Sequence, residues 1–174
     1  MRLSRASPPP NGYVFLAGAA LSGQQVIAWQ SRRIAASLPR PLRLLAGAVE
    51  RHQERVRARL LASTTDTIRL RRTRLNARWF REYMIYDPAQ DLAIVHPVLA
   101  ITGAKDTQVD PDHVATIGRT VTGSFDGEVP ADLSHLLRRD PRPASLRTYR
   151  KQLRQPVDRW VIDRTTDRAR LHLT

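Results

Sequence analysis

Three apolar runs stand out in the alternation of hydrophobic and polar positions. Tyr13–Ala20 lies between the turn-forming pairs Asn11-Gly12 and Ser22-Gly23, and Pro97–Thr102 is rich in residues that favour β structure. A third run, Thr120–Val129, mixes strand formers with glycines. The pattern therefore predicts about three strands, of which the run at 97–102 is the clearest.

Apolar residues at helical spacing occupy most of the chain between and after these runs. Ser22 and Gln25 have the spacing of a capping box, which predicts a helix start, and Pro39 and Pro41 end that helix. Strands separated by helices indicate the α/β class. The first three helices are expected from Ser22 to Pro39, from about 44 to 61, and from the helix-start cluster 63–66 to Tyr86-Asp87-Pro88. The third helix carries Leu75, Trp79 and Tyr83, spaced by four. Two more helices are expected from 111 to 119 and from about 157 to 173.

Length and composition narrow the class of protein. The 174 residues suffice for one ordinary domain, expected over 13–174 after an irregular leader at 1–12. The chain has no cysteine, which excludes disulfides, thiolate metal sites and cysteine nucleophiles. No apolar run approaches the roughly 20 residues that span a bilayer. Arg2, Arg5 and the run at 13–20 resemble an export signal, but the prolines at 8–10 interrupt it, so a cytoplasmic protein is expected.

The net charge of +13 raises the question of a polyanion partner. Of the 29 basic residues only Lys105 and Lys151 are lysines, and the arginines are spread along the whole chain, often near acidic residues. Few aromatic residues are interleaved with them as a stacking platform would need. Nucleic-acid binding is therefore not expected as the main function.

One acid and one histidine stand out as candidate catalytic residues. Asp106 follows the clearest strand through Gly103, which permits a sharp turn, and His135 follows the weaker strand. Taken singly, Asp106 could cap the next helix and His135 could be a helix-start histidine. Taken together, their order and spacing are those of the last two members of a Ser–Asp–His triad on an α/β sheet.

Several short motifs in one order resemble the α/β-hydrolases, in particular bacterial serine hydrolases and esterases with a helical lid. The resemblance covers most of 13–165 but only the C-terminal half of the family's fold. The motifs are Phe15-Leu16-Ala17-Gly18, Trp79-Phe80-Arg81, Tyr86-Asp87-Pro88, Pro97-Val98-Leu99-Ala100, Gly103-Ala104-Lys105-Asp106-Thr107-Gln108-Val109 and Leu133-Ser134-His135-Leu136-Leu137.

The resemblance implies a fold, a reaction and two catalytic residues. The chain would be the C-terminal part of an α/β-hydrolase, with about three strands, a lid insertion at about 22–85, acid and histidine segments within 97–140, and a closing helix at about 157–173. Asp106 would be the triad acid and His135 the histidine. The substrate would be a small-molecule ester or related acyl compound, and no cofactor or metal is implied.

The nucleophile is the main departure from the family pattern, because the sequence has no G-x-S-x-G elbow. Ser22 precedes Asp106 and His135 in the right order, but it lacks the flanking glycines, and no strand is predicted between it and residue 90. Ser124 stands at the wrong position between its glycines. His113 lies near two acidic residues, but without a second suitably spaced histidine it does not predict a metal site.

Three explanations of the missing nucleophile remain open: a truncated or frame-shifted product, a start within a longer enzyme, or a separate chain that supplies the nucleophile half. Each leaves the strand at 13–20 with an unpaired edge, so we expect the isolated chain to be marginally stable or prone to aggregation. A cooperative thermal transition of a soluble monomer with the usual enthalpy for its size would contradict this. The alternatives to a hydrolase are an arginine-rich, non-catalytic polyanion-binding protein and an inactive fragment.

Overall fold

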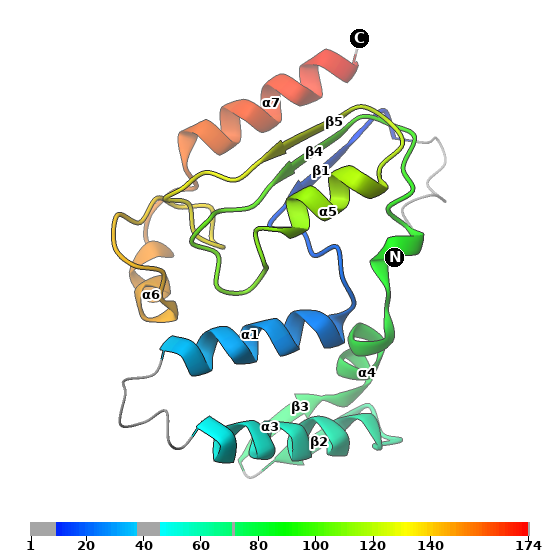
Figure 1. The fold of residues 1–174 in the computed structure, drawn as a ribbon, viewed down its shortest axis with the longest axis vertical. Coiled ribbons are helices and arrows are strands. Elements are labelled where there is room, and N and C mark those ends of the chain that lie inside the picture. Colours follow the sequence, from blue (N-terminus) through cyan, green and yellow to red (C-terminus); the bar gives the residue numbers. More distant parts are fainter. Residues whose placement is uncertain (1–9, 38–45, 71, 174) are drawn as a thin grey trace. The chain divides into compact units, whose positions relative to one another are not determined.

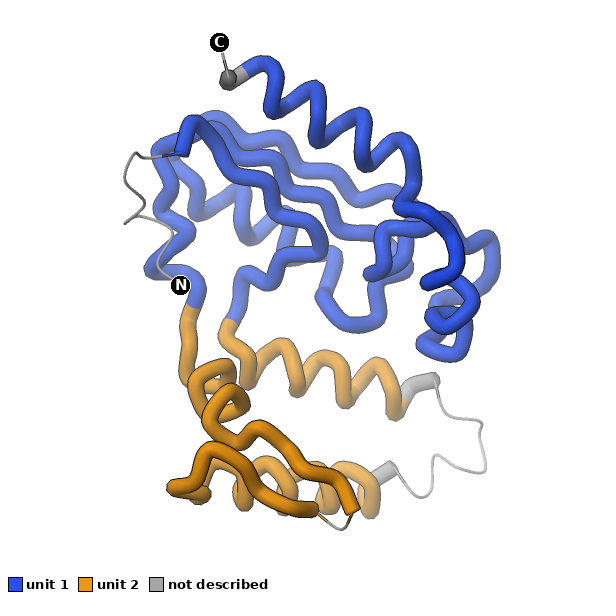
Figure 2. Tube along the Cα trace, turned by 180° about the vertical axis from the view of Figure 1, so that it is seen from behind, with its two compact units in different colours: residues 1–21, 88–174 blue, residues 22–87 orange. Residues whose placement is uncertain are grey.

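The computed structural model describes residues 10–37, 46–70 and 72–173, and its elements are shown in Figure 1. The chain divides into two compact units, drawn in blue and orange in Figure 2. Unit 1 combines residues 1–21 with 88–174, and unit 2 is the intervening segment 22–87. Unit 2 spans almost the same residues, about 22–85, that the family resemblance assigns to a lid insertion; the lid role stays a prediction.

Unit 1 contains a three-stranded sheet, which makes this an α/β structure. The strands are β1 (Tyr13–Leu16), β4 (Val98–Ile101) and β5 (Phe125–Glu128), in the order β1-β4-β5, and both pairs are parallel. All four residues of β4 are buried, as expected for the central strand of a parallel sheet covered on both faces. The three apolar runs of the sequence thus supply the three strands of this sheet.

Two helices cover opposite faces of this sheet (Figure 1). The helix α5 (His113–Thr120) connects β4 to β5 and packs Val114 and Ile117 against Val98 and Ala100. The helix α7 (Arg159–Leu173) covers the other face, where Val161 packs with Leu99, Ile101 and Leu133. Alternate residues of β4 therefore enter two different apolar cores, because successive side chains of a strand point to opposite faces.

The strand β1 lies at one edge of the sheet, as the sequence predicts. Tyr13 and Phe15 pack against the α5-side core. Val14 and Leu16, on the opposite face, remain 39% and 42% exposed. A strand edge with exposed apolar side chains favours association with other chains. The aggregation of the isolated chain stays a prediction.

Short elements complete unit 1. The 3-10 helix η2 (Pro88–Gln90) leads toward β4. After β5, an irregular stretch is followed by the 3-10 helix η3 (Leu146–Thr148), which continues directly into the one-turn helix α6 (Tyr149–Gln152). Figure 1 shows α6 at the end of the sheet where β4 and β5 finish.

Unit 2 begins with the predicted capping box. The Ser22 backbone N–H donates to Gln25 Oε1 (3.1 Å), and the Gln25 N–H donates to Ser22 Oγ (3.4 Å). These bonds satisfy backbone donors at the start of α1 (Gly23–Ser37). The next helix, α3 (Ala46–Leu61), matches the one predicted over 44–61, whereas the helix ending expected at Pro39 and Pro41 lies outside the described residues.

The helix predicted from 63–66 onward is wrong in its first part. The structure has an antiparallel hairpin of β2 (Thr67–Leu70) and β3 (Thr73–Asn76), and helix α4 begins only at Ala77 and ends at Ile85. Ile68 pairs with Leu75 in this hairpin, so Leu75 belongs to a strand although it lies four residues before Trp79. The polar–apolar alternation at 67–70 is the sequence signal for the first of these strands. Unit 2 thus contains two strands that the sequence analysis did not predict.

The Asn76 side chain accepts a hydrogen bond from the Trp79 N–H (2.9 Å) and so caps the start of α4. Trp79 and Tyr83 then stack with ring centroids 5.1 Å apart. Among the described residues, no helix combines the length and the apolar character needed to cross a membrane.

Candidate functional site

The turn after β4 carries Asp106. The Asp106 N–H donates to the carbonyl oxygen of Gly103 (2.9 Å), which closes the turn directly beyond the strand. The Asp106 side chain is fully buried. A buried carboxylate needs hydrogen-bond donors around it, and the structure supplies three of them.

The two oxygens of the Asp106 carboxylate have separate partners. Oδ1 accepts from the backbone N–H groups of Gln108 (2.7 Å) and Val109 (2.8 Å). Oδ2 lies 2.8 Å from Nδ1 of His135. Because two backbone groups hold Oδ1, the carboxylate has one orientation, and in that orientation Oδ2 faces the imidazole.

His135 lies on a tight loop after β5. The Leu137 N–H donates to the Ser134 carbonyl (2.9 Å), and the Ser134 N–H donates to the Arg138 carbonyl (3.0 Å). Leu137 has a φ of 58°, a left-handed conformation that is uncommon for a residue other than glycine. The loop thus turns sharply around His135, whose side chain remains 27% exposed.

The geometry leaves Nε2 of the imidazole available for chemistry. A carboxylate oxygen accepts hydrogen bonds, so the pairing with Asp106 places the proton on Nδ1 of a neutral His135. No other described side chain forms a hydrogen bond with the His135 ring. Nε2 can then accept a proton from a nucleophile, which is the role of the histidine in acyl transfer.

The acid turn and the histidine loop are joined through their backbones. The Ala104 N–H donates to the Pro130 carbonyl (2.9 Å), and the Lys105 N–H donates to the Leu133 carbonyl (3.0 Å). The approach is close at Gly103, where a Cβ atom would lie 1.9 Å from the Leu133 oxygen. The structure therefore brings together both site residues that the sequence predicts, Asp106 and His135.

Ser22, the alternative nucleophile considered from the sequence, and Ser134, beside His135, both have structural roles. The Ser22 hydroxyl lies 2.9 Å from Gln25 Oε1 and serves the capping box of α1. Ser134, next to His135, is buried and donates its hydroxyl to Gln152 Oε1 (2.6 Å). Within the described ranges, no cluster of three or more histidine and carboxylate side chains could hold a metal ion.

His113 is the first residue of α5, and its Nδ1 accepts the Ala20 backbone N–H (3.2 Å). Burial lowers the pKa of His113 below its ordinary value of 6.5, and the nearby carboxylates of Asp110, Asp112 and Asp106 oppose this only in part. The imidazole is therefore neutral in the folded chain at neutral pH, as its acceptor role requires.

His113 should make the free energy of unfolding pH-dependent. As the pH falls below about 6.5, the unfolded chain protonates this histidine before the folded chain does, so stability decreases down to the lowered pKa. In His113→Asn, Oδ1 can still accept the Ala20 N–H but does not titrate, so this decrease should be smaller. Urea unfolding of both proteins at about pH 7.5 and pH 5 measures the difference, and equal decreases would contradict the assignment.

Three buried or half-buried polar residues near the site carried no signal in the sequence. Asp140, Tyr149 and Gln152 lie outside the strands and helices that the sequence predicts. The Arg142 guanidinium holds the pKa of Asp140 well below its usual range. Their contacts join positions far apart in the chain, and no local pattern records such contacts.

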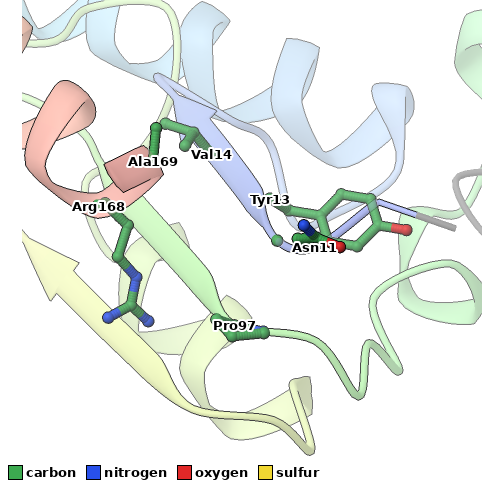
Figure 3. A pocket seen from close by; sticks show the side chains of 7 residues that line it. Asn11, Tyr13, Val14, Pro97, Arg168 and Ala169 are labelled. Carbon is green, nitrogen blue, oxygen red and sulfur yellow. The ribbon is translucent and has the colours of Figure 1, made fainter. Parts of the chain in front are cut away.

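A separate hollow of about 180 Å³ lies at the opposite end of the sheet, where β1 and β4 begin. Its lining includes Val14, Pro97, Arg168 and Ala169. Figure 3 shows Val14 beside Ala169, with the Arg168 guanidinium turned toward β5. Arg168 there forms an ion pair with Asp126 at 2.6 Å. Neither of the two predicted site residues, Asp106 and His135, lines this hollow.

Comparisons of this chain with protein-family models, curated proteins and solved structures gave no match. The parallel sheet and its helices establish the α/β fold class. Because no comparison gives a relative, any functional assignment depends on the geometry of Asp106 and His135.

Proposed function

We propose that this chain is the C-terminal part of an α/β-hydrolase-fold serine hydrolase, cytoplasmic, that acts on an ester or related acyl bond. The observation that carries the proposal is the 2.8 Å contact between His135 Nδ1 and Asp106 Oδ2. Both residues follow the carboxyl ends of adjacent parallel strands, which is where α/β sheets place their ligand sites.

In the proposed mechanism a serine outside the sequence shown attacks the acyl carbonyl. His135 Nε2 takes the serine proton as general base and returns it to the leaving group as general acid. Asp106 holds the imidazole in the Nδ1–H tautomer and stabilises the imidazolium that forms. In this proposal unit 2 is the helical lid region, which by family resemblance shapes the acyl or alcohol pocket.

The pairing of arginines bears on the polyanion-binding alternative. In the part of the chain that the structure describes, eight arginines form ion pairs with acidic side chains: Arg57, Arg78, Arg139, Arg142, Arg159, Arg164, Arg168 and Arg170. These carboxylates neutralise part of the positive charge locally, so no observation favours that alternative. Strong weakening of binding by salt would identify a polyanion partner, because ester hydrolysis has no such dependence.

The proposal predicts a nucleophile encoded next to this chain. Translation of the DNA upstream of the Met1 codon in all three forward frames should give a G-x-S-x-G elbow after an apolar strand. When that polypeptide is produced together with this chain, a fluorophosphonate probe, which reacts with activated serines, should label the elbow serine. Labelling should require this chain.

Substitutions separate the dyad from a general effect of the chain. His135→Ala should abolish the labelling, because the serine loses its base. His52→Ala, which removes an exposed imidazole on α3, should leave it unchanged. Absence of an elbow in every frame, or labelling that persists in His135→Ala, would overturn the proposed function.

A further inference from the structure

The one-turn helix α6 contacts both loops of the candidate site. The Tyr149 hydroxyl lies 2.8 Å from Oγ1 of Thr107, the residue after Asp106. Gln152 Oε1 accepts the hydroxyl of Ser134, the residue before His135, at 2.6 Å. The two contacts lie at opposite ends of α6, three residues apart.

We propose that α6 is a clamp in which Tyr149 and Gln152 are positioning residues for the Asp106–His135 pair. The inference rests on the proposed function for its purpose, but its geometry stands independently of any nucleophile. A loop histidine that is partly exposed can turn away from its carboxylate, and a misplacement of about 1 Å can cost about 100-fold in rate. Fixing the neighbours of both residues limits that freedom.

Gln152 is held in one orientation. Its side chain is almost completely buried. Nε2 donates to Asp140 Oδ2 (2.8 Å) and to Thr148 Oγ1 (2.8 Å), while Oε1 accepts from Ser134. Both amide hydrogens and the amide oxygen have partners, so a flipped amide would leave buried donors and acceptors unpaired. The position of the Ser134 hydroxyl is fixed by this amide.

Asp140 connects this side of the clamp to the acid turn. Its carboxylate accepts from Gln152 and from Arg142 Nε (3.0 Å). Lys105, the residue before Asp106, donates its Nζ to the backbone carbonyls of Asp140 and Arg142. The network thus runs from the residue before the acid, through Asp140 and Gln152, to the residue before the histidine.

Tyr149 secures the other side of the acid. Burial raises the pKa of the Tyr149 phenol above its usual value, so the group stays neutral and keeps its proton at physiological pH. A neutral phenol can exchange a hydrogen bond with the Thr107 hydroxyl, as the 2.8 Å distance indicates. Of the two neighbours of Asp106, Lys105 is therefore held by the carbonyls of Asp140 and Arg142, and Thr107 is held by Tyr149.

The test uses the chain as it stands and needs no catalytic activity. In ¹⁵N-labelled protein at about pH 8, where an ordinary imidazole is neutral, the ring-nitrogen shifts of His135 report which nitrogen carries the proton. The parent chain should show the Nδ1–H tautomer. Tyr149→Phe and Gln152→Met should each raise the population lacking the Nδ1–H bond about fivefold, the factor for one lost hydrogen bond of about 1 kcal/mol.

Two further variants make the result decisive. Thr120→Val removes one hydroxyl that bonds within α5 (Thr116 carbonyl, 2.9 Å) and should leave the His135 shifts unchanged. Asp106→Asn is the reference in which the Nδ1–H bond is lost. If the His135 shifts change in Asp106→Asn but stay unchanged in Tyr149→Phe, the clamp alone is overturned. Unchanged shifts in Asp106→Asn would overturn both the clamp and the proposed function. If Gln152→Met fails to fold, Tyr149→Phe decides.

Discussion

In the proposed hydrolase, assembled with its nucleophile half, replacing Asp106 by asparagine should lower kcat by about 10⁴-fold, the largest catalytic effect that we expect from a single change. This factor corresponds to about 5.4 kcal/mol of transition-state stabilisation. The measurement is steady-state hydrolysis of a small ester by this chain together with its nucleophile half.

The physical reason lies in the two separate roles of the Asp106 oxygens. Asparagine can still accept the Gln108 and Val109 N–H groups through Oδ1, so the turn is retained. Its –NH₂ group would then face His135 Nδ1 in place of Oδ2. Two donors cannot pair, so Nδ1 must become the acceptor, and the ring proton moves to Nε2. An imidazole in that tautomer cannot accept the serine proton.

Asp112→Asn is the matched control, because it makes the same chemical change at an exposed carboxylate six residues further along. It should leave kcat within about twofold of the parent value, since exposed charges contribute little. An Asp106→Asn enzyme that retains more than about one tenth of the parent kcat would remove Asp106 from the mechanism.

Replacing Gly103 by alanine should produce the largest loss of stability. The new Cβ would lie 1.9 Å from the Leu133 carbonyl oxygen and 2.3 Å from its carbon, far inside van der Waals contact. Backbone atoms cannot swing aside as a side chain can, so the acid turn and the histidine loop must separate. The Lys105 N–H bond to Leu133 would be lost as well. We expect a loss of about 3 kcal/mol or more in the free energy of unfolding.

Gly47→Ala provides the control for the added methyl group. Gly47 is exposed near the start of α3, and its nearest neighbour for a Cβ is the Arg51 side chain at 3.5 Å. Alanine should leave stability unchanged or raise it by up to about 1 kcal/mol, because glycine is a poor helix former. Urea unfolding of both variants measures the effect, and a Gly103→Ala protein as stable as the parent would show that the loops tolerate separation.

The sheet and the meeting of Asp106 with His135 could be predicted from local patterns. Residues 98–101 are all apolar, as a central parallel strand requires, and an acid and a histidine follow two strands of one sheet. Because parallel strands end at the same edge, such residues come together without knowledge of any longer-range contact. The catalytic role of the pair remains a proposal.

The hairpin and the clamp could not be predicted in the same way. Leu75, Trp79 and Tyr83 repeat at intervals of four, and this repeat hid the strand alternation before Asn76. The contacts of α6 join residues 42 and 18 positions apart, Thr107 with Tyr149 and Ser134 with Gln152. Such contacts depend on where the chain returns in space, which the spacing of side chains along the sequence does not record.

The pairing of β1 with β4 also has a consequence for the order of events during synthesis. Tyr13 pairs with Val98, 85 positions later, and all of unit 2 lies between them. At about 5–20 residues per second, the ribosome needs roughly 4–17 s to add the partner strand. Throughout that interval, the apolar side chains of β1 lack the β4 partner, while the local contacts of unit 2 can already form. Nascent β1 is therefore the segment that a chaperone would find exposed for longest.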